Sequence, residues 1–287
     1  MLYTMKNALK VAQKNKFALG AYNIGSAELL RIAVDTCVEN NAPFILAIHP
    51  DELEYLTDGF IEYAKYEANN SKVPVVIHLD HGASIEQIKR AIKCGFTSVM
   101  IDASSKSFED NIKTTKEVVE YAKNYNVSVE AELGTIGDLG ETLEGGTPKI
   151  IYTDPIKAGE FVEKTGIDTL AVAVGTSHGI YPKHMEPHIR TDIIKEINKN
   201  VSIPLVLHGG SSNPDSEIKE AVSLGVCKVN ISSDIKLALF DEVRKYLNAN
   251  ELALEPLKIF PEGIKSAKNV LEHKLNLLNC IDKAKLY

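Results

Sequence analysis

The sequence predicts an α/β protein, an eight-stranded (β/α)8 barrel of the TIM type with an additional C-terminal helix. Short apolar runs recur eight times, and an amphipathic helical pattern follows each of them. No change of composition marks a linker, so we expect residues 1–287 to form a single domain. Right-handed βα crossovers repeated eight times close into a barrel of about this length. An open, doubly wound sheet is the structural alternative, because strand order is invisible in a sequence.

The expected strands are short, rich in β-branched residues and bounded by turn residues. This pattern is typical of parallel strands that are buried on both faces. We expect them at Ala18–Tyr22, Phe44–Ile48, Val75–Leu79, Ser98–Ile101, Ser128–Glu132, Thr169–Val174, Leu205–His208 and Cys227–Ile231.

The expected helices lie between these strands, where apolar residues recur at helical spacing. They are Ala27–Asn40, Glu52–Asn69, Ile85–Cys94, Phe108–Tyr125, Ile156–Thr165, Ile189–Asn198, Glu217–Leu224 and Ile235–Leu247, with a final helix at Ile264–Leu278. Ser84, Asp154 and Asn213 stand where a side chain caps the start of a helix. Gly95 and Gly225 stand where a helix ends.

Composition excludes several classes of function. Hydrophobic residues make up 44% of the chain and charged residues 25%, as in ordinary globular proteins. A net charge of -7 without any basic patch argues against nucleic acid as a partner. The chain shows no signal-peptide segment and no apolar stretch of membrane-spanning length, so we expect a cytoplasmic protein without a membrane partner. The four cysteines form no C-x-x-C pair, and we expect buried, reduced thiols at Cys37, Cys94, Cys227 and Cys280.

Three of the apolar runs lead to a histidine that is followed by glycine. His81, His178 and His208 each lie just past an expected strand, at the face where parallel barrels build active sites. One such histidine alone is more often a hydrogen-bonded polar residue. Three from three strands match the His₃ ligand set of a catalytic zinc ion with an open position for substrate. His78 lies deeper on its strand, and we expect it to support the site.

Acidic residues end the neighbouring strands. Asp80 directly precedes His81, Asp102 ends the next strand, and Glu130 and Glu132 end the one after that. Alternate residues of a strand point the same way, so the two glutamates share a face, with Glu132 nearer the rim. Acids in such places often cap helices or pair with lysines. Asp80 could bind a metal, orient a metal ligand, or act as a general acid and base.

Two loops are typical of a phosphate site. The segment His208-Gly209-Gly210-Ser211-Ser212 follows the seventh expected strand, and Asn230-Ile231-Ser232-Ser233-Asp234 follows the eighth. Barrels frequently bind phosphate at these two positions. Glycines let backbone N–H groups approach an anion, and serine hydroxyls add further donors.

An unusually long connection joins Glu132 to Asp154. Its segment 133–149 holds five glycines and three acidic residues, and we expect it to form a lid over the site. Zinc, a nearby carboxylate, a phosphate site and a lid glutamate together indicate carbanion chemistry on a phosphorylated sugar, with zinc polarising a carbonyl group.

These motifs resemble those of the class II, zinc-dependent fructose- and tagatose-bisphosphate aldolases. The segments that carry the resemblance occur in family order over nearly the whole chain. They are Ala21-Tyr22-Asn23, His78-Leu79-Asp80-His81-Gly82, Met100-Ile101-Asp102-Ala103-Ser104, Val129-Glu130-Ala131-Glu132-Leu133-Gly134, Gly175-Thr176-Ser177-His178-Gly179, Leu207-His208-Gly209-Gly210 and Lys228-Val229-Asn230-Ile231.

The resemblance implies that His81, His178 and His208 bind Zn²⁺. Asp102 and Glu132 would then belong to an alternative metal position or support the ligands.

The resemblance also implies that Asp80 exchanges a proton with the C4 hydroxyl of the sugar, or with the aldehyde oxygen in the condensation direction. A lid glutamate would handle the proton at the carbon of the ene-diolate, and Glu141 matches that role better than Glu144. The implied substrate-binding residues, with a monovalent cation (Na⁺ or K⁺) beside the phosphate, are Asn23, Gly179, Gly209, Gly210, Ser211, Asn230, Ser232 and Ser233.

Three departures from the family pattern bear on the substrate. Gly20 stands where the family usually has proline, and His49 where it commonly has serine or threonine. The C-terminal tail lacks the usual arginine for the far phosphate; Lys283 or Lys285 could supply a cation there, without the bidentate fork of arginine. The triose-phosphate half of the site therefore matches the family, while the other half differs.

We expect a zinc-dependent lyase of carbohydrate metabolism, an aldolase that reversibly cleaves fructose 1,6-bisphosphate to dihydroxyacetone phosphate and glyceraldehyde 3-phosphate, as in glycolysis. An aldolase for tagatose 1,6-bisphosphate or another phosphorylated keto-sugar is the alternative. A metal-dependent phosphohydrolase or amidohydrolase would be expected to carry an H-x-H pair on its first strand, which this sequence lacks. A sugar-phosphate sensor would leave Asp80 without a role. The family resemblance further suggests a homodimer or homotetramer.

Overall fold

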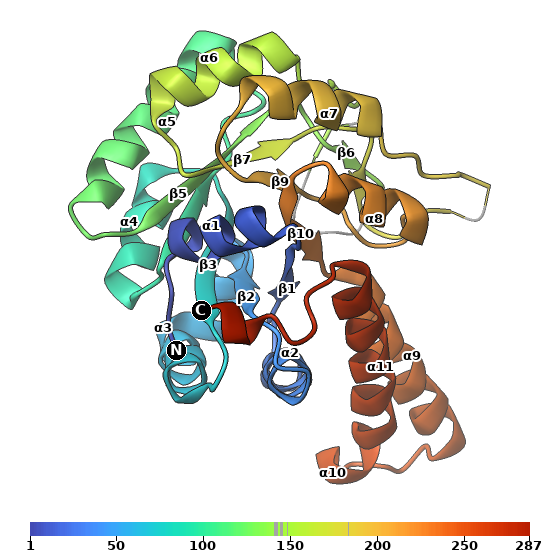
Figure 1. The fold of residues 1–287 in the computed structure, drawn as a ribbon. Helices are drawn as coiled ribbons and strands as arrows, with labels where there is room; N and C mark the ends of the chain where they lie inside the picture. The colour runs from blue at the N-terminus through green and yellow to red at the C-terminus, as the bar shows by residue number, and fades with distance from the viewer. Residues whose placement is uncertain (141–142, 144–145, 148, 183) are drawn as a thin grey trace.

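A closed barrel of eight parallel strands forms the centre of the protein. The computed structural model describes residues 1–140, 143, 146–147, 149–182 and 184–287. The strands pair in the circular order β1-β10-β9-β7-β5-β4-β3-β2, and helices surround them (Figure 1). This closed order confirms the predicted barrel and excludes the open sheet.

The barrel strands fall close to the predicted segments. They are β1 (Leu19–Asn23), β2 (Phe44–Ile48), β3 (Val75–Gly82), β4 (Ser98–Ile101), β5 (Ser128–Leu133), β7 (Thr169–Val172), β9 (Leu205–Leu207) and β10 (Val226–Ile231). All of their residues are buried, which explains the continuous apolar runs in the sequence.

Two strands differ from prediction in a way that matters for the site. β3 continues through His81 to Gly82 instead of ending at Leu79. β7 ends at Val172, so His178 lies in a separate short strand, β8 (Ser177–His178), which pairs with β6 (Gly137–Asp138). The start of the long connection after β5 therefore runs beside the segment that carries His178.

The helices that follow the strands also lie close to prediction. They are α2 (Ala27–Glu39), α3 (Pro50–Asn70), α4 (Ile85–Cys94), α5 (Phe108–Lys123), α6 (Pro155–Thr165), α7 (Thr191–Asn200) and α8 (Asp215–Ser223). Ser84 and Asp154 accept backbone N–H groups at the starts of α4 and α6, as predicted. The capping role predicted for Asn213 is wrong, because no side chain caps α8 and the Asn213 amide donates to carbonyls of the preceding loop instead.

A helix that the sequence analysis did not predict, α1 (Met5–Asn15), closes the amino-terminal end of the barrel. It contacts β3, β5 and β10, which lie on different sides of the barrel. Its Met5 and Leu9 side chains are fully buried, and the backbone N–H of Lys6 donates to Ser128 Oγ at 2.9 Å. This segment has the mixed polar and apolar sequence of an ordinary amphipathic helix.

The C-terminal part forms an arm and then a returning tail. α9 (Ser233–Ala249), α10 (Pro256–Ile259) and α11 (Pro261–Leu277) project together from the barrel, with α9 and α11 side by side (Figure 1). α11 is the predicted final helix. Beyond it the chain, including η1 (Ala284–Leu286), returns to the amino-terminal end of the barrel, where Tyr287 Oη donates to the Ala8 carbonyl at 2.8 Å.

None of the helices within the described ranges is both long enough and apolar enough to cross a membrane. All four cysteines are free and buried, as predicted from their spacing.

Candidate active site

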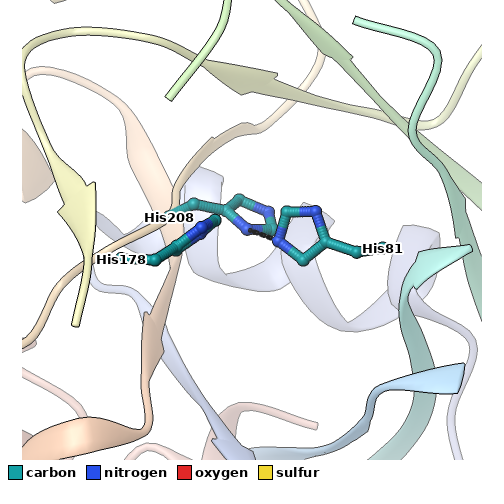
Figure 2. Close-up of side chains that lie close together, drawn as sticks. All are labelled: His81, His178 and His208. Atoms are coloured by element: carbon teal, nitrogen blue, oxygen red, sulfur yellow. Dashed lines mark hydrogen bonds between the residues drawn. The ribbon is translucent and has the colours of Figure 1, made fainter. Parts of the chain in front are cut away.

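Three histidines meet at the carboxyl-terminal end of the barrel (Figure 2). His81 comes from β3, His178 from β8, and His208 from the residue that follows β9. All three side chains are buried, and one ring nitrogen of each lies within 4.8 Å of the others. His81 Nε2 and His208 Nδ1 are 2.9 Å apart. The structure therefore brings together the three residues that the sequence singled out.

A bulge in β3 places His81 and Asp80. The pairing of β3 with β4 shifts between Leu79 and Gly82, so β3 carries one extra residue there. His81 occupies the left-handed backbone region with φ 54°. Bulges and strained backbone of this kind are typical of functional sites, because they redirect side chains that a regular strand would point elsewhere.

Gly209 brings the loops of His178 and His208 into contact. Its φ is 62°, and a Cβ atom at this position would lie 2.5 Å from the carbonyl oxygen of Ser177. A side chain would be excluded both by that close approach and by the backbone conformation. Glycine is therefore required here for the two histidine-bearing segments to pack together.

Two of the imidazole rings are hydrogen-bonded to carboxylates. Asp102 Oδ2 lies 3.1 Å from His81 Nδ1, and Glu130 Oε1 lies 3.0 Å from His208 Nε2. Since a carboxylate only accepts hydrogen bonds, these ring nitrogens carry the protons. The other two nitrogens, His81 Nε2 and His208 Nδ1, then face each other at 2.9 Å, so either a proton or a metal ion lies between them. Burial lowers the pKa of His81, but Asp80 and Asp102 outweigh it and raise the pKa to about 10, which reflects the same demand for positive charge.

A second group of possible ligands lies beside the first. His81, Asp102 and Glu132 offer ligand atoms within 4.8 Å of one another. Burial, and then the charge of Asp102, raise the pKa of Glu132 well above its usual range. Glu132 Oε2 is buried and has no hydrogen-bond partner in the described part of the chain. Two facing carboxylates with an unsatisfied oxygen also fit a cation.

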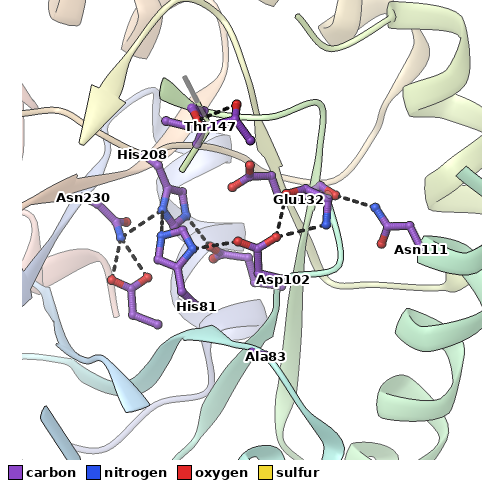
Figure 3. Close-up of polar contacts among 12 residues, drawn as sticks. His81, Ala83, Asp102, Asn111, Glu132, Thr147, His208 and Asn230 are labelled. Carbon is purple, nitrogen blue, oxygen red and sulfur yellow. Dashed lines mark hydrogen bonds and ion pairs between the residues drawn. The ribbon is translucent and has the colours of Figure 1, made fainter. Parts of the chain in front are cut away.

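Asp80 lies against the histidines as a buried, anchored carboxylate. Asn230 Nδ2 lies 2.9 Å and 3.1 Å from its two oxygens, and Asn23 Nδ2 donates to Oδ2 at 3.3 Å. Burial opposes ionisation, but His81 and His208 outweigh it and hold the pKa of Asp80 well below its usual range. The contacts from Asn230 through His208 and His81 to Asp102 form a continuous chain (Figure 3).

A cavity of about 290 Å³ opens beside these groups. His81, His178, Asp102 and Glu132 form its inner wall, and His49 also lines it. The other lining residues are Ala83, Ser104, Ser105, Thr135, Ile136, Leu143, Gly146 and Thr147. Lysine and arginine are both missing among the described residues of this wall.

The two predicted phosphate loops are adjacent. Gly210 N–H donates to the Asn230 carbonyl at 2.9 Å, and Ser211 Oγ accepts the backbone N–H of Asp234 at 3.3 Å. Asp234, which ends the second predicted loop but was not among the predicted binding residues, accepts Ser212 N–H at 3.1 Å and pairs with Lys274 of α11 at 2.6 Å. Its place in the first turn of α9, after two serines, was the available signal.

Other predicted residues lie elsewhere. Lys283 and Lys285 belong to the tail at the amino-terminal end of the barrel, where Asp282 N–H donates to the Asn40 carbonyl, so this chain's own tail does not reach the histidines. That expectation is wrong because the chain turns back beneath the barrel after α11. Glu141 and Glu144 lie outside the described residues.

Comparison with known proteins decides the family. The sequence profile described as class II fructose-bisphosphate aldolase matches residues 3–283. The chain belongs to this family. As a class II aldolase it is a lyase of carbohydrate metabolism, in agreement with the resemblance noted from its motifs.

Named relatives of this class II aldolase differ in the sugar they are named for. A fructose-bisphosphate aldolase of Staphylococcus aureus is 40% identical over 289 residues, covering 99% of each chain. The D-tagatose-1,6-bisphosphate aldolase subunit GatY of Klebsiella oxytoca is 38% identical over 280 residues, covering 97% of this chain and 98% of that one. Among solved structures, the YdjI aldolase of Escherichia coli K12 matches with a TM-score of 0.84 and 33% identity, covering 99% of this chain and 100% of that chain.

Proposed function

We propose that this class II aldolase is zinc-dependent and reversibly cleaves fructose 1,6-bisphosphate to dihydroxyacetone phosphate and glyceraldehyde 3-phosphate. The observation that carries the proposal is the convergence of three buried histidines, with ring nitrogens within 4.8 Å, at the catalytic end of the barrel. Tagatose 1,6-bisphosphate is the alternative substrate, since one relative is named for each sugar.

His81, His178 and His208 would hold the zinc ion. The donor set fits, because three buried imidazoles leave a tetrahedral ion one position for substrate, and two of the rings have their outward nitrogens hydrogen-bonded to carboxylates. When bound, zinc supplies Lewis-acid polarisation of the substrate carbonyl. Asp102 and Glu132 would form, with His81, an alternative metal position.

Asp80 would move the proton at the sugar's C4 hydroxyl. In cleavage its carboxylate takes that proton as the C3–C4 bond breaks and the aldehyde leaves, and in condensation it returns the proton to the aldehyde oxygen. Asn23 and Asn230 donate to Asp80 and would keep it aimed at the site. We assign the proton at the ene-diolate carbon to Glu141, with Glu144 as the alternative; both residues lie outside the described part of the chain.

The adjacent loops after β9 and β10 would bind the triose phosphate. Both loops are rich in glycine and serine, which suit an oxyanion, and a Na⁺ or K⁺ ion beside the phosphate would balance its charge. The residues proposed for this role are Gly179, Gly209, Gly210, Ser211, Asn230, Ser232 and Ser233.

A phosphorylated keto-sugar with an uncharged far end is a second candidate substrate. It is favoured by the cavity wall, whose described residues include His49 and several hydroxyl groups but no lysine or arginine. A second phosphate would normally be matched by such a cation.

Three exposed leucines at the tip of the arm support a homodimer or homotetramer. Leu252, Leu254 and Leu257 near the tip of the arm are 94%, 85% and 88% exposed. Clustered exposed leucines are typical of surfaces that another chain covers. We also propose that residues 1–287 act as one domain and, from the sequence, that the protein is cytoplasmic.

The proposal is tested by a coupled assay of triose phosphate release from fructose and tagatose 1,6-bisphosphates, with a chelator and with zinc restored. Chelator-sensitive cleavage that zinc restores would support the metal aldolase and rank the two sugars. Cleavage that survives complete zinc removal would refute the three-histidine site. Zinc-loaded protein that cleaves neither sugar would favour the second candidate substrate.

A further inference from the structure

A lysine and a glutamate form an ion pair inside the barrel, next to the histidine site. Lys228 of β10 and Glu130 of β5 are both fully buried, and Lys228 Nζ lies 2.7 Å from Glu130 Oε1. They are 98 residues apart in the sequence, on strands that are not neighbours in the barrel.

Stability does not account for this pair. The interior of such barrels is normally filled by branched apolar side chains. Removing two charges from water is costly, and well-packed apolar residues of similar volume are often equally or more stabilising than a buried ion pair. Departures from an apolar interior tend to mark positions that serve function.

The pair is in direct contact with the histidine site. Glu130 Oε1, the oxygen that binds Lys228, is also the atom 3.0 Å from His208 Nε2. The other oxygen, Oε2, accepts a hydrogen bond from Thr169 Oγ1 at 3.3 Å. Lys228 Nζ also contacts His78 Nε2 at 3.4 Å, and His78 Nδ1 in turn contacts Ser98 Oγ at 2.8 Å. Side chains from several strands thus hold this carboxylate in one place.

We propose that Lys228 and Glu130 are positioning residues for the metal site. Lys228 holds the Glu130 carboxylate, and Glu130 accepts Nε2–H of His208, which leaves Nδ1 of His208 as the metal-binding atom. The proposal rests on the zinc site of the proposed function and adds the pair that selects the tautomer of one ligand. A ring with its proton on Nδ1 would present a donor where the metal needs a lone pair.

The surroundings of His208 agree with this role. His208 is fully buried and lies between the Glu130 carboxylate and the His81 ring. Nδ1 points toward His81 Nε2 at 2.9 Å, the direction in which the histidines converge. Asp102 accepts a hydrogen bond from His81 Nδ1 in the same way. This second carboxylate lies near the rim and accepts a hydrogen bond from Ser104 Oγ, whereas Glu130 pairs with a lysine.

The test compares zinc affinity and ring tautomer in the full-length protein. Glu130→Leu with Lys228→Met removes both charges together and leaves no lone buried charge, so the fold is expected to survive. Glu130→Gln with Lys228→Met restores an oxygen that can accept Nε2–H. Thr169→Val is the matched control, because it removes a hydrogen bond from the same carboxylate but leaves its contacts with Lys228 and His208.

Zinc dissociation constants come from competition with a chromophoric chelator, and the tautomer comes from the ring ¹⁵N shifts of His208. We expect the Leu/Met variant to bind zinc about 10- to 100-fold more weakly than wild type, and the Gln/Met variant to recover part of that loss. The Thr169→Val variant should stay within about threefold of wild type. Wild-type His208 should carry its proton on Nε2 both with and without zinc.

Two results would overturn the inference: a folded Leu/Met variant with wild-type zinc affinity, or a wild-type His208 with its proton on Nδ1. The second measurement does not depend on any variant folding. A wild-type chain that fails to bind zinc at all would instead overturn the proposed function, and the inference with it.

Discussion

The two ends of the barrel are built on different principles. At the amino-terminal end, α1 buries Met5 and Leu9 against the strands, and the C-terminal tail packs beside it through Tyr287. At the carboxyl-terminal end, His81 has a left-handed backbone within a bulged strand, and Asp80 is fully buried with its pKa held well below the usual range. The amino end stabilises the fold, whereas the carboxyl end accepts strain and buried charge in order to hold reactive groups.

The contrast extends to how polar groups are satisfied. At the amino end, the backbone N–H of Lys6 in α1 has an ordinary partner in Ser128 Oγ. At the other end, Glu132 Oε2 is buried without a hydrogen-bond partner within the described part of the chain, and two histidine nitrogens face each other at 2.9 Å. A buried oxygen without a partner is unfavourable until a ligand or ion completes it, so mutations at the two ends should affect different properties.

The largest effect on activity is expected at the carboxyl end, from Asp80→Ala. This variant loses the group that moves the C4 hydroxyl proton, and kcat should fall by about 10²- to 10⁴-fold. Coupled triose phosphate assays, with zinc content measured on the same samples, check the expectation. Wild-type kcat in a zinc-loaded variant would contradict the role of Asp80. Suppose that wild type shows no cleavage and that the Asp80→Ala variant still responds fully to dihydroxyacetone phosphate as a ligand. This result would favour a sugar-phosphate sensor over an aldolase.

The largest effect on stability is expected at the amino end, from Leu9→Ala. Leu9 is fully buried in α1, and the truncation should lower the free energy of unfolding by about 2–5 kcal/mol. Urea denaturation measures this loss. The exposed neighbour Lys10 supplies the matched control, since Lys10→Ala should change stability by no more than about 0.5 kcal/mol. A marked fall in kcat of the folded Leu9→Ala protein would show that the two ends are not separable.

A smaller effect is expected from His49→Ser in the cavity wall. His49 Nδ1 accepts the Asp51 N–H at 3.2 Å, which leaves the proton on Nε2 as a donor for substrate. Serine keeps the cap of α3 but removes that donor. The ratio of kcat/KM for the fructose and tagatose substrates should shift by about 2- to 10-fold, with zinc affinity unchanged. Kinetics measured in parallel on both sugars check this expectation. An unchanged ratio of kcat/KM would exclude a role for His49 in substrate selection.

The smallest effect is expected from Lys283→Ala combined with Lys285→Ala. These residues lie at the amino-terminal end of the barrel, so KM for either bisphosphate should change by less than about twofold. Steady-state kinetics on the double variant measure this KM. A large rise in KM would mean that the tail of a second copy reaches the site, and the comparison of the two ends would then have to include the assembled oligomer.

Local patterns in the sequence were enough to predict the barrel and the group of ligand candidates. Eight buried parallel strands require eight apolar runs, and each run is readable without knowledge of its neighbours. His81, His178 and His208 could be selected because the carboxyl ends of parallel strands meet at one face whatever the strand order. Helix α1 was missed because an amphipathic segment before the first strand carries no strand-end signal.

Contacts between distant strands could not be predicted in the same way. Lys228 stands in a buried strand, an unusual place for a lysine, but nothing in the local sequence reveals that it meets Glu130 across the barrel. The bulge at His81, the approach of Gly209 to Ser177 and the return of the tail to the amino end likewise depend on how separate segments pack. Hydrophobic periodicity acts over a few residues and so determined the elements and the face of the site. The partners of each buried charge depend on barrel closure, which only the tertiary structure decided.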